Sequence, residues 1–187
     1  MDPYAASMLT RPMRAVAAAS RVLRFGRSKF VGHLERRIVG FDREVVGAMD
    51  AGIDQVVIVG AGYDSRAWRF ARAGVTFFEV GHPVTQADKR RRAPAGGPVY
   101  VADDLAGGLI VDALVAAGFD RARPSAPGSR LAVNFSPRTT PVLQALGSLS
   151  RERHVFHATP EEAAALVEGA RWTDVVAGPV LVTAAHR

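Results

Sequence analysis

The stretch VVIVGAGYD, residues 56–64, decides the fold class of this 187-residue chain. Its four β-branched apolar residues predict a buried strand over residues 55–59, and Gly60 and Gly62 predict a tight turn directly after it. Because glycine has no Cβ, such a turn lets the backbone approach a ligand closely. A helix expected over residues 65–73 would present free N–H groups and the positive end of its dipole at the same place. Strand, turn and helix together are typical of a nucleotide-binding α/β domain.

The spacing within the turn separates it from dinucleotide-binding sites. Those sites carry G-x-G-x-x-G, and the third glycine position is Ser65 in this chain. The turn therefore favours a site for S-adenosylmethionine (SAM) over a site for NAD. An ordinary structural turn is the alternative interpretation.

Short apolar runs alternate with helical stretches along the rest of the chain, which predicts a doubly wound, mostly parallel α/β sheet. Further strands are expected over residues 75–80, 99–102, 131–135 and 180–185, the last as an antiparallel edge strand. Further helices are expected over residues 105–117, 140–149 and 159–169. The last of these begins with Thr-Pro-Glu-Glu, which combines an N-cap threonine with a proline at the first helical position.

We expect one domain over residues 1–187, with a helical cap over residues 1–45 and an α/β core over residues 46–187. The cap includes a surface helix that begins near Pro12. The formal charge is +6 and 48% of the residues are hydrophobic, which is typical of a soluble globular protein. The chain has no apolar run of the roughly 20 residues that span a bilayer, so we expect a cytoplasmic protein without membrane contact.

Residue usage also limits the kind of site. The chain contains no cysteine, which excludes disulfides, thiolate metal ligands and cysteine nucleophiles. His154 and His157 lie three residues apart without further ligands, so no metal site is predicted. The basic run at residues 89–92 is expected to be solvent-exposed, and the low aromatic content of 7% argues against nucleic-acid binding.

Acidic residues near two strand ends are candidates for ligand contacts. Glu79 could accept both ribose hydroxyls of a nucleoside, although strand alternation can turn it elsewhere. Asp103 and Asp104 follow the third expected strand and could accept from an adenine amino group. A helix N-cap is the alternative interpretation of this acidic pair.

Four stretches in this order resemble the leucine carboxyl methyltransferase family: GAGYDSRAWR (60–69), FFEVGHPVTQADK (77–89), VYVADDL (99–105) and AGFD (117–120). The family reads GAGxDTRxxRL, EVDHPxTQxxK and VxVDF, and DPYA at residues 2–5 is similar to a motif near its start. The resemblance implies a Rossmann-like SAM-dependent methyltransferase fold, with SAM as cofactor. It also implies O-methylation of a small molecule or a carboxylate as the activity.

The resemblance implies a set of cofactor contacts. Arg37 would pair with the carboxylate of the cofactor, the turn would line its methionine part, and Asp64 would steady the turn. Asp104 and Leu105 would flank the adenine, with Asp103 as the nearby alternative. The candidate residues are thus Arg37, Gly60, Ala61, Gly62, Asp64, Glu79, Asp103, Asp104 and Leu105.

No catalytic residue is predicted. A carboxylate substrate is already ionised and needs no general base. For a hydroxyl substrate His82 is the nearest candidate base, and a turn residue before Pro83 is the favoured interpretation of this histidine.

Three departures from the family bear on function. Gly81 stands where EVDHP has its ribose-binding aspartate. The strand and helix that precede the family's PGSRL strand are missing before residues 127–131, and the chain opens at DPYA without the family's N-terminal helix. A second hypothesis is therefore a methyltransferase-fold protein that has lost or changed its chemistry. A missing central strand would also leave the sheet with an interior gap or an exposed apolar edge, which predicts a homodimer or poor stability as a monomer.

Overall fold

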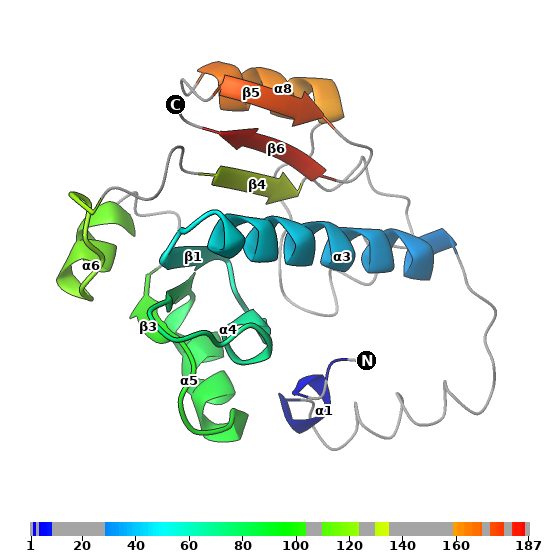
Figure 1. The fold of residues 1–187 in the computed structure, drawn as a ribbon. Helices are drawn as coiled ribbons and strands as arrows, with labels where there is room; N and C mark the ends of the chain where they lie inside the picture. Colours follow the sequence, from blue (N-terminus) through cyan, green and yellow to red (C-terminus); the bar gives the residue numbers. More distant parts are fainter. Residues whose placement is uncertain are drawn as a thin grey trace. The chain divides into compact units, whose positions relative to one another are not determined.

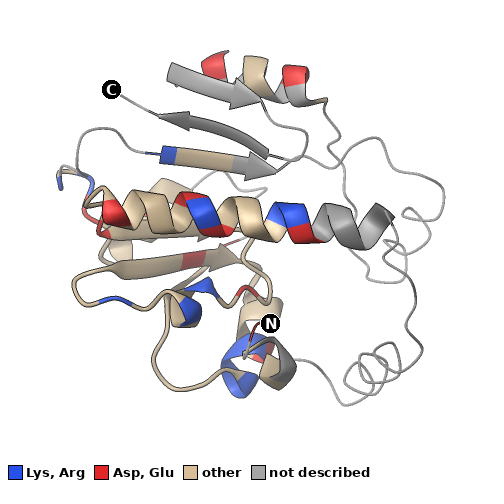
Figure 2. Cartoon of the chain, turned by 45° about the vertical axis from the view of Figure 1, so that its right-hand side comes forward, with Lys and Arg blue, Asp and Glu red and all other residues tan. Residues whose placement is uncertain are grey.

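The computed structural model describes residues 2, 4–8, 29–103, 110–123, 130–134, 159–169, 173–177 and 181–185 (Figure 1). The chain divides into two compact units. The first comprises Met1–Gly26 and Met49–Ala126, and the second comprises Arg27–Ala48 and Pro127–Arg187. Helix α3 (Lys29–Asp50) belongs mostly to the second unit. Figure 2 shows basic and acidic residues close together along the coloured part of this helix.

A parallel three-stranded sheet forms the centre of the first unit. Its strands are β1 (Gln55–Val59), β2 (Thr76–Gly81) and β3 (Val99–Ala102), in the order β1-β2-β3. The central strand β2 is buried from its second residue onward, whereas the residues of β1 are partly exposed. The predicted α/β class, with parallel strands alternating with helices, is confirmed here.

Apolar packing holds this sheet to the helix that follows β3. Phe78, Val80, Val101 and Leu114 form one buried cluster, which joins β2 and β3 to α6 (Ile110–Ala116). The ring of Phe119 meets Phe78 edge-on, with 5.6 Å between the ring centroids. Full burial of such side chains stabilises a fold by roughly 1.5–3 kcal/mol each.

Two helices of the first unit differ from the sequence predictions. Helix α4 (Arg66–Arg69) is shorter than the expected 65–73, because the chain leaves it for a turn in which Val75 N donates to Arg72 O and Gly74 has φ 82°. Helix α5 (Pro83–Arg92) was not predicted. Its signals are Pro83 at the first helical position and the preceding His82 as N-cap.

The second unit contains an antiparallel sheet. Its strands are β4 (Arg130–Asn134), β5 (Thr173–Ala177) and β6 (Leu181–Ala185), in the order β4-β6-β5. The antiparallel direction predicted for the last strand is confirmed. Its predicted place at the edge is wrong, because β5, which the sequence analysis missed, pairs with the free side of β6.

Helix α8 (Pro160–Gly169) lies against β5 and β6 and begins as the sequence predicts. Thr159 N donates to Glu162 Oε2 at 2.7 Å, and Glu162 N donates to Thr159 Oγ1 at 3.2 Å. These reciprocal bonds form a capping box, which satisfies two backbone donors that the helix itself cannot pair.

The described strands therefore form two separate sheets of three, and within the described part of the chain β1 and β4 each pair on one side only. The helix expected near Pro12, the helix expected over residues 140–149, and His154 with His157 lie outside the described residues. Of the helices that the structure describes, none has both the length and the apolarity to cross a bilayer.

Candidate functional site

The glycine turn, residues 60–64, is held against the carboxyl end of β2. Ala61 N donates to Val80 O at 3.1 Å, and Asp64 N donates to Ala61 O at 2.8 Å. Gly60 and Gly62 have φ values of 67° and 49°, in the left-handed region that favours glycine. A Cβ on Gly62 would meet only Gly60 O, at 3.9 Å. Backbone conformation rather than space therefore requires glycine at this position.

Asp64 joins this turn to α4. Its Oδ1 accepts a hydrogen bond from Arg66 N at 2.7 Å, and its Oδ2 pairs with the Arg66 guanidinium. The carboxylate is thus engaged with the first residue of α4, and it holds the turn against that helix.

Glu79 is fully buried and forms an ion pair with Lys89 of α5, which is also fully buried. Burial raises the pKa of Glu79 to about 7, against the opposing effect of the Lys89 ammonium. Its Oε1 has no hydrogen-bond partner within the described part of the chain. The Glu79 side chain is thus directed at Lys89 inside the first unit, and its Oε2 is engaged there.

Lys89 differs from its sequence prediction. The run 89–92 was expected to be solvent-exposed, and this is wrong for Lys89 because its ammonium lies among aromatic rings. Its Nζ is 5.3 Å from the ring centroid of Trp68 and 6.0 Å from that of Tyr100. Burial, together with the Glu79 charge, raises the pKa of Tyr100 to about 12. This cluster is not among the sequence predictions, although Gln86 and Lys89 at i and i+3 indicate a shared helix face.

Gln86 connects β2 and β3. Its Nε2 donates to Glu79 O at 2.8 Å and to Val101 O at 2.9 Å, so both hydrogens of the amide are used. Gly81 lies beside this amide. A Cβ on Gly81 would be 3.7 Å from Gln86 Nε2, which is an ordinary contact distance. A Cβ at position 81 is therefore sterically acceptable.

Asp103 follows β3, and its backbone N donates to Gly81 O at 3.1 Å. Its Oδ2 is buried and has no hydrogen-bond partner among the described residues. A buried carboxylate oxygen without a donor is costly, so a ligand donor at this position would be favourable. Asp104 and Leu105 lie outside the described residues.

The structure therefore brings five of the candidate residues together with Gly81 at the carboxyl edge of one sheet. These are Gly60, Ala61, Gly62, Asp64 and Asp103. Glu79 lies in the same sheet with its side chain engaged by Lys89. Arg37 is an exposed residue of α3 in the second unit.

His82, the candidate base, is exposed, and its Nδ1 accepts from Val84 N at 3.3 Å as the N-cap of α5. This agrees with its interpretation as a turn residue. No group of three or more metal-ligating side chains occurs in the part of the chain that the structure describes.

Comparison with known proteins identifies the family. The model of the leucine carboxyl methyltransferase family matches residues 1–129, which include the glycine turn, Gly81 and Asp103. The chain belongs to the leucine carboxyl methyltransferase family. The resemblance drawn from the sequence motifs is thereby confirmed.

Two mycobacterial relatives illustrate the extent of the match, and both are described as candidate SAM-dependent methyltransferases. One, from Mycobacterium marinum, is 40% identical over 103 residues, which cover 51% of this chain and 32% of the relative. Another, from Mycolicibacterium paratuberculosis, is 34% identical over 148 residues, which cover 61% of this chain and 47% of the relative. The chain thus spans a third to a half of the length of these relatives.

A solved structure supports the fold. The magnesium protoporphyrin IX methyltransferase of Synechocystis PCC 6803, with bound SAH (S-adenosylhomocysteine), aligns with a TM-score of 0.51 at 15% identity. The alignment covers 92% of this chain and 94% of that protein. At this identity the likeness establishes the SAM-dependent methyltransferase fold alone.

Proposed function

We propose that this member of the leucine carboxyl methyltransferase family binds SAM at the carboxyl edge of the β1-β2-β3 sheet and methylates an oxygen of a small molecule or a carboxylate. The observation that carries the proposal is the buried Asp103 Oδ2, which has no hydrogen-bond partner among the described residues, in a residue whose backbone N bonds Gly81 O at the edge where the glycine turn lies. Ligands of open α/β sheets bind at this edge, because the strand ends and the following turns meet there. A nucleoside amine or hydroxyl would donate a hydrogen bond to Asp103 Oδ2.

The residues divide into groups by proposed role. The glycine turn receives the methionine part of the cofactor, and Asp103 receives the adenosine part. Asp104 and Leu105 flank the adenine. Asp64 and Glu79 act through the protein, since both carboxylates are engaged, by Arg66 and Lys89 respectively.

SAM supplies a methyl group on a sulfonium, and the transfer depends mainly on alignment and on exclusion of water. The chain's task is therefore to hold the cofactor in one orientation and to position the acceptor oxygen. A carboxylate acceptor needs no general base, which agrees with the engagement of His82 as a helix cap.

A second candidate is a methyltransferase-fold protein that has lost methyl transfer or performs another reaction. Gly81 favours it, because the family's ribose aspartate is absent there, and losing such a contact costs about a hundredfold in affinity.

Calorimetric titration of the purified full chain with SAM and with SAH tests the proposal. Micromolar binding of either supports a working cofactor site and justifies a screen of acceptors. Absence of binding of both at millimolar concentration overturns the proposal and leaves the second candidate.

We further propose that two copies of the chain associate through the β1 edge. Its sequence, QVVIV, carries no charge and no proline to block added strands, and Val59 is 54% exposed. Light scattering at micromolar concentration should give a dimer mass that Val59→Lys reduces. A monomer in the unmodified chain contradicts this association.

A further inference from the structure

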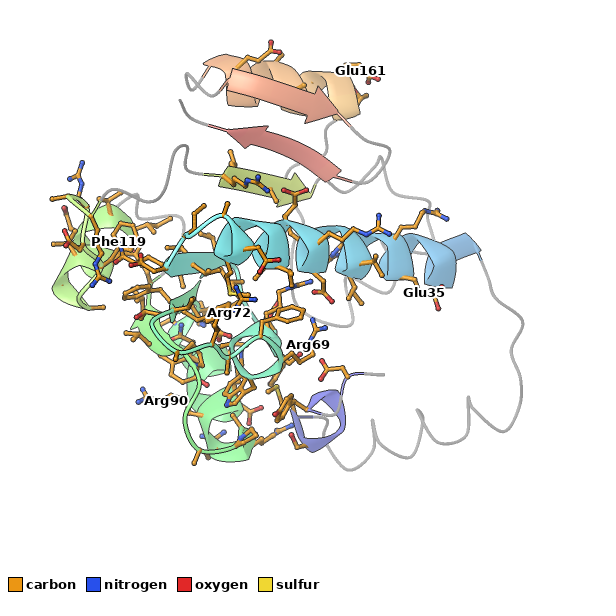
Figure 3. All side chains as sticks on the ribbon, in the orientation of Figure 1. Glu35, Arg69, Arg72, Arg90, Phe119 and Glu161 are labelled. Atoms are coloured by element: carbon orange, nitrogen blue, oxygen red, sulfur yellow. The ribbon has the colours of Figure 1, made fainter. Side chains whose placement is uncertain are left out.

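The N-terminal segment (Asp2, Tyr4 and α1, Ala5–Met8) contacts the helix that follows the glycine turn. Ser65 Oγ donates to Asp2 Oδ2, across 63 positions of sequence. Arg69 Nε donates to Ser65 Oγ at 3.1 Å and lies 3.7 Å from Asp2 Oδ2. Figure 3 labels Arg69 next to this segment. Asp2 Oδ1 also accepts from Tyr4 N at 2.9 Å, so both carboxylate oxygens have partners.

The same segment has two further attachments. Met8 is only 3% exposed, and the Tyr4 ring lies 6.4 Å from that of Trp68, centroid to centroid. Arg92 of α5 donates to Met8 O at 3.2 Å. The segment is therefore packed into the first unit and is joined to both α4 and α5.

The glycine turn is also held from the side of α5. Tyr63 Oη donates to Asp88 Oδ2 at 2.5 Å, and Asp88 in turn accepts from Arg92 at 2.8 Å. Arg92 thus links the partner of Tyr63 to the N-terminal segment. The turn is anchored at Tyr63 by α5 and immediately beyond its end, at Ser65, by Asp2.

We infer that Asp2 is a positioning residue for the cofactor-binding turn. This inference rests on the proposed function. Glycines widen the range of conformations open to a chain, so a turn with two of them is costly to order when a ligand binds. An anchor from outside the turn orders it during folding, so less conformational entropy is lost when the ligand binds. Asp2 supplies that anchor through Ser65 and Arg69.

Asp2→Ala in the full chain, with Asp50→Ala as the matched control, tests the inference. Asp50 is also a carboxylate paired with an arginine, Arg72 at 2.9 Å, and its removal changes the charge equally. In calorimetric titration with SAH, Asp2→Ala should weaken binding about tenfold, as expected for loss of a charge-assisted hydrogen bond. Asp50→Ala should bind like the unmodified chain.

Amide hydrogen exchange supplies a readout that does not need the ligand. Peptides covering residues 60–69 should exchange faster in Asp2→Ala, while peptides covering β2 keep their rate. Asp2→Asn keeps an oxygen acceptor for Ser65 and loses the charge that faces Arg69. It should fall between the two in both measurements.

The outcomes separate this inference from the proposed function. If the unmodified chain does not bind SAH, the proposed function fails, and exchange at residues 60–69 alone decides the role of Asp2. If Asp2→Ala matches Asp50→Ala in affinity and in local exchange, the inference is overturned. If Asp2→Ala accelerates exchange throughout the chain, it has unfolded globally, and Asp2→Asn then decides by the same two measurements.

Discussion

The two sheets of this protein differ in strand direction, and therefore in whether the turns that follow their strands lie at one edge. In the β1-β2-β3 sheet all strands run in one direction, so the glycine turn, Gly81 and Asp103 meet at a single edge. In the β4-β6-β5 sheet neighbouring strands run in opposite directions, so successive strand ends lie at opposite edges. Strand direction therefore explains why most of the described candidate residues belong to the first unit.

The sheets also differ in how their helices are attached. Helix α5 is joined to the parallel sheet by a buried ion pair and by the Gln86 amide. The described polar contacts of α8 in the antiparallel unit lie at its exposed N-terminus, at Thr159 and Glu162. The first unit should therefore be sensitive to loss of single buried polar groups.

The largest effect is expected from Lys89→Met. It leaves the Glu79 carboxylate buried without its partner, which should lower the free energy of unfolding by about 3–5 kcal/mol. Urea unfolding followed by circular dichroism measures this. Arg91→Ala is the control on the same helix, because the Arg91 side chain is 70% exposed and should matter little. Equal stability of the two variants would show that the buried pair is not a main support of the sheet.

The stability of Lys89→Met should also depend on pH. Burial raises the pKa of Glu79 to about 7 from 4.5, and Lys89 opposes this rise, so the variant holds the proton to higher pH still. The folded state then binds more protons than the unfolded state above pH 4.5, and the free energy of unfolding falls as pH rises. Unfolding curves at pH 5 and pH 8 check the sign. A variant that is more stable at pH 8 contradicts the assignment.

Gly81→Asp should strengthen SAH binding by about a hundredfold, because it returns a carboxylate to the strand end that faces the proposed ribose. The site has room for the Cβ. Gly81→Ala is the control, since it adds the Cβ without the carboxylate. An unchanged and already tight affinity would indicate that a different group, such as Asp103, meets the ribose.

The smallest effect is expected in the second unit. Thr159→Ala removes half of the capping box and should lower the free energy of unfolding by about 1 kcal/mol. Calorimetry should find SAH affinity unchanged, because α8 contributes no residue to the proposed site. A tenfold loss of affinity would contradict the assignment of the site to the parallel sheet.

Local sequence signals predicted the parts of this fold that depend on neighbouring residues. The strand 55–59 and the strand 99–102 have the predicted bounds, and the Thr159 cap forms as its motif indicates. Strand β5 and the central position of β6 depend on pairing between distant segments, which one sequence does not display.

The candidate site was predictable to a similar degree. The glycine turn follows from the residue types, because only glycine takes its dihedrals readily. The direction of the Glu79 side chain could not be predicted, because it depends on Lys89 reaching between Trp68 and Tyr100. The contact between Asp2 and Ser65 joins residues 63 positions apart and leaves no periodic signal.

The Gln86 amide has a mechanical consequence. It donates to one carbonyl of β2 and to one carbonyl of β3, and so adds a side-chain link between two strands that are already paired. Because this amide belongs to α5, it links the position of the helix to the positions of β2 and β3. A ligand that displaces β2 or β3 would therefore also displace α5. The exposed outer face of that helix would then change position when the ligand binds.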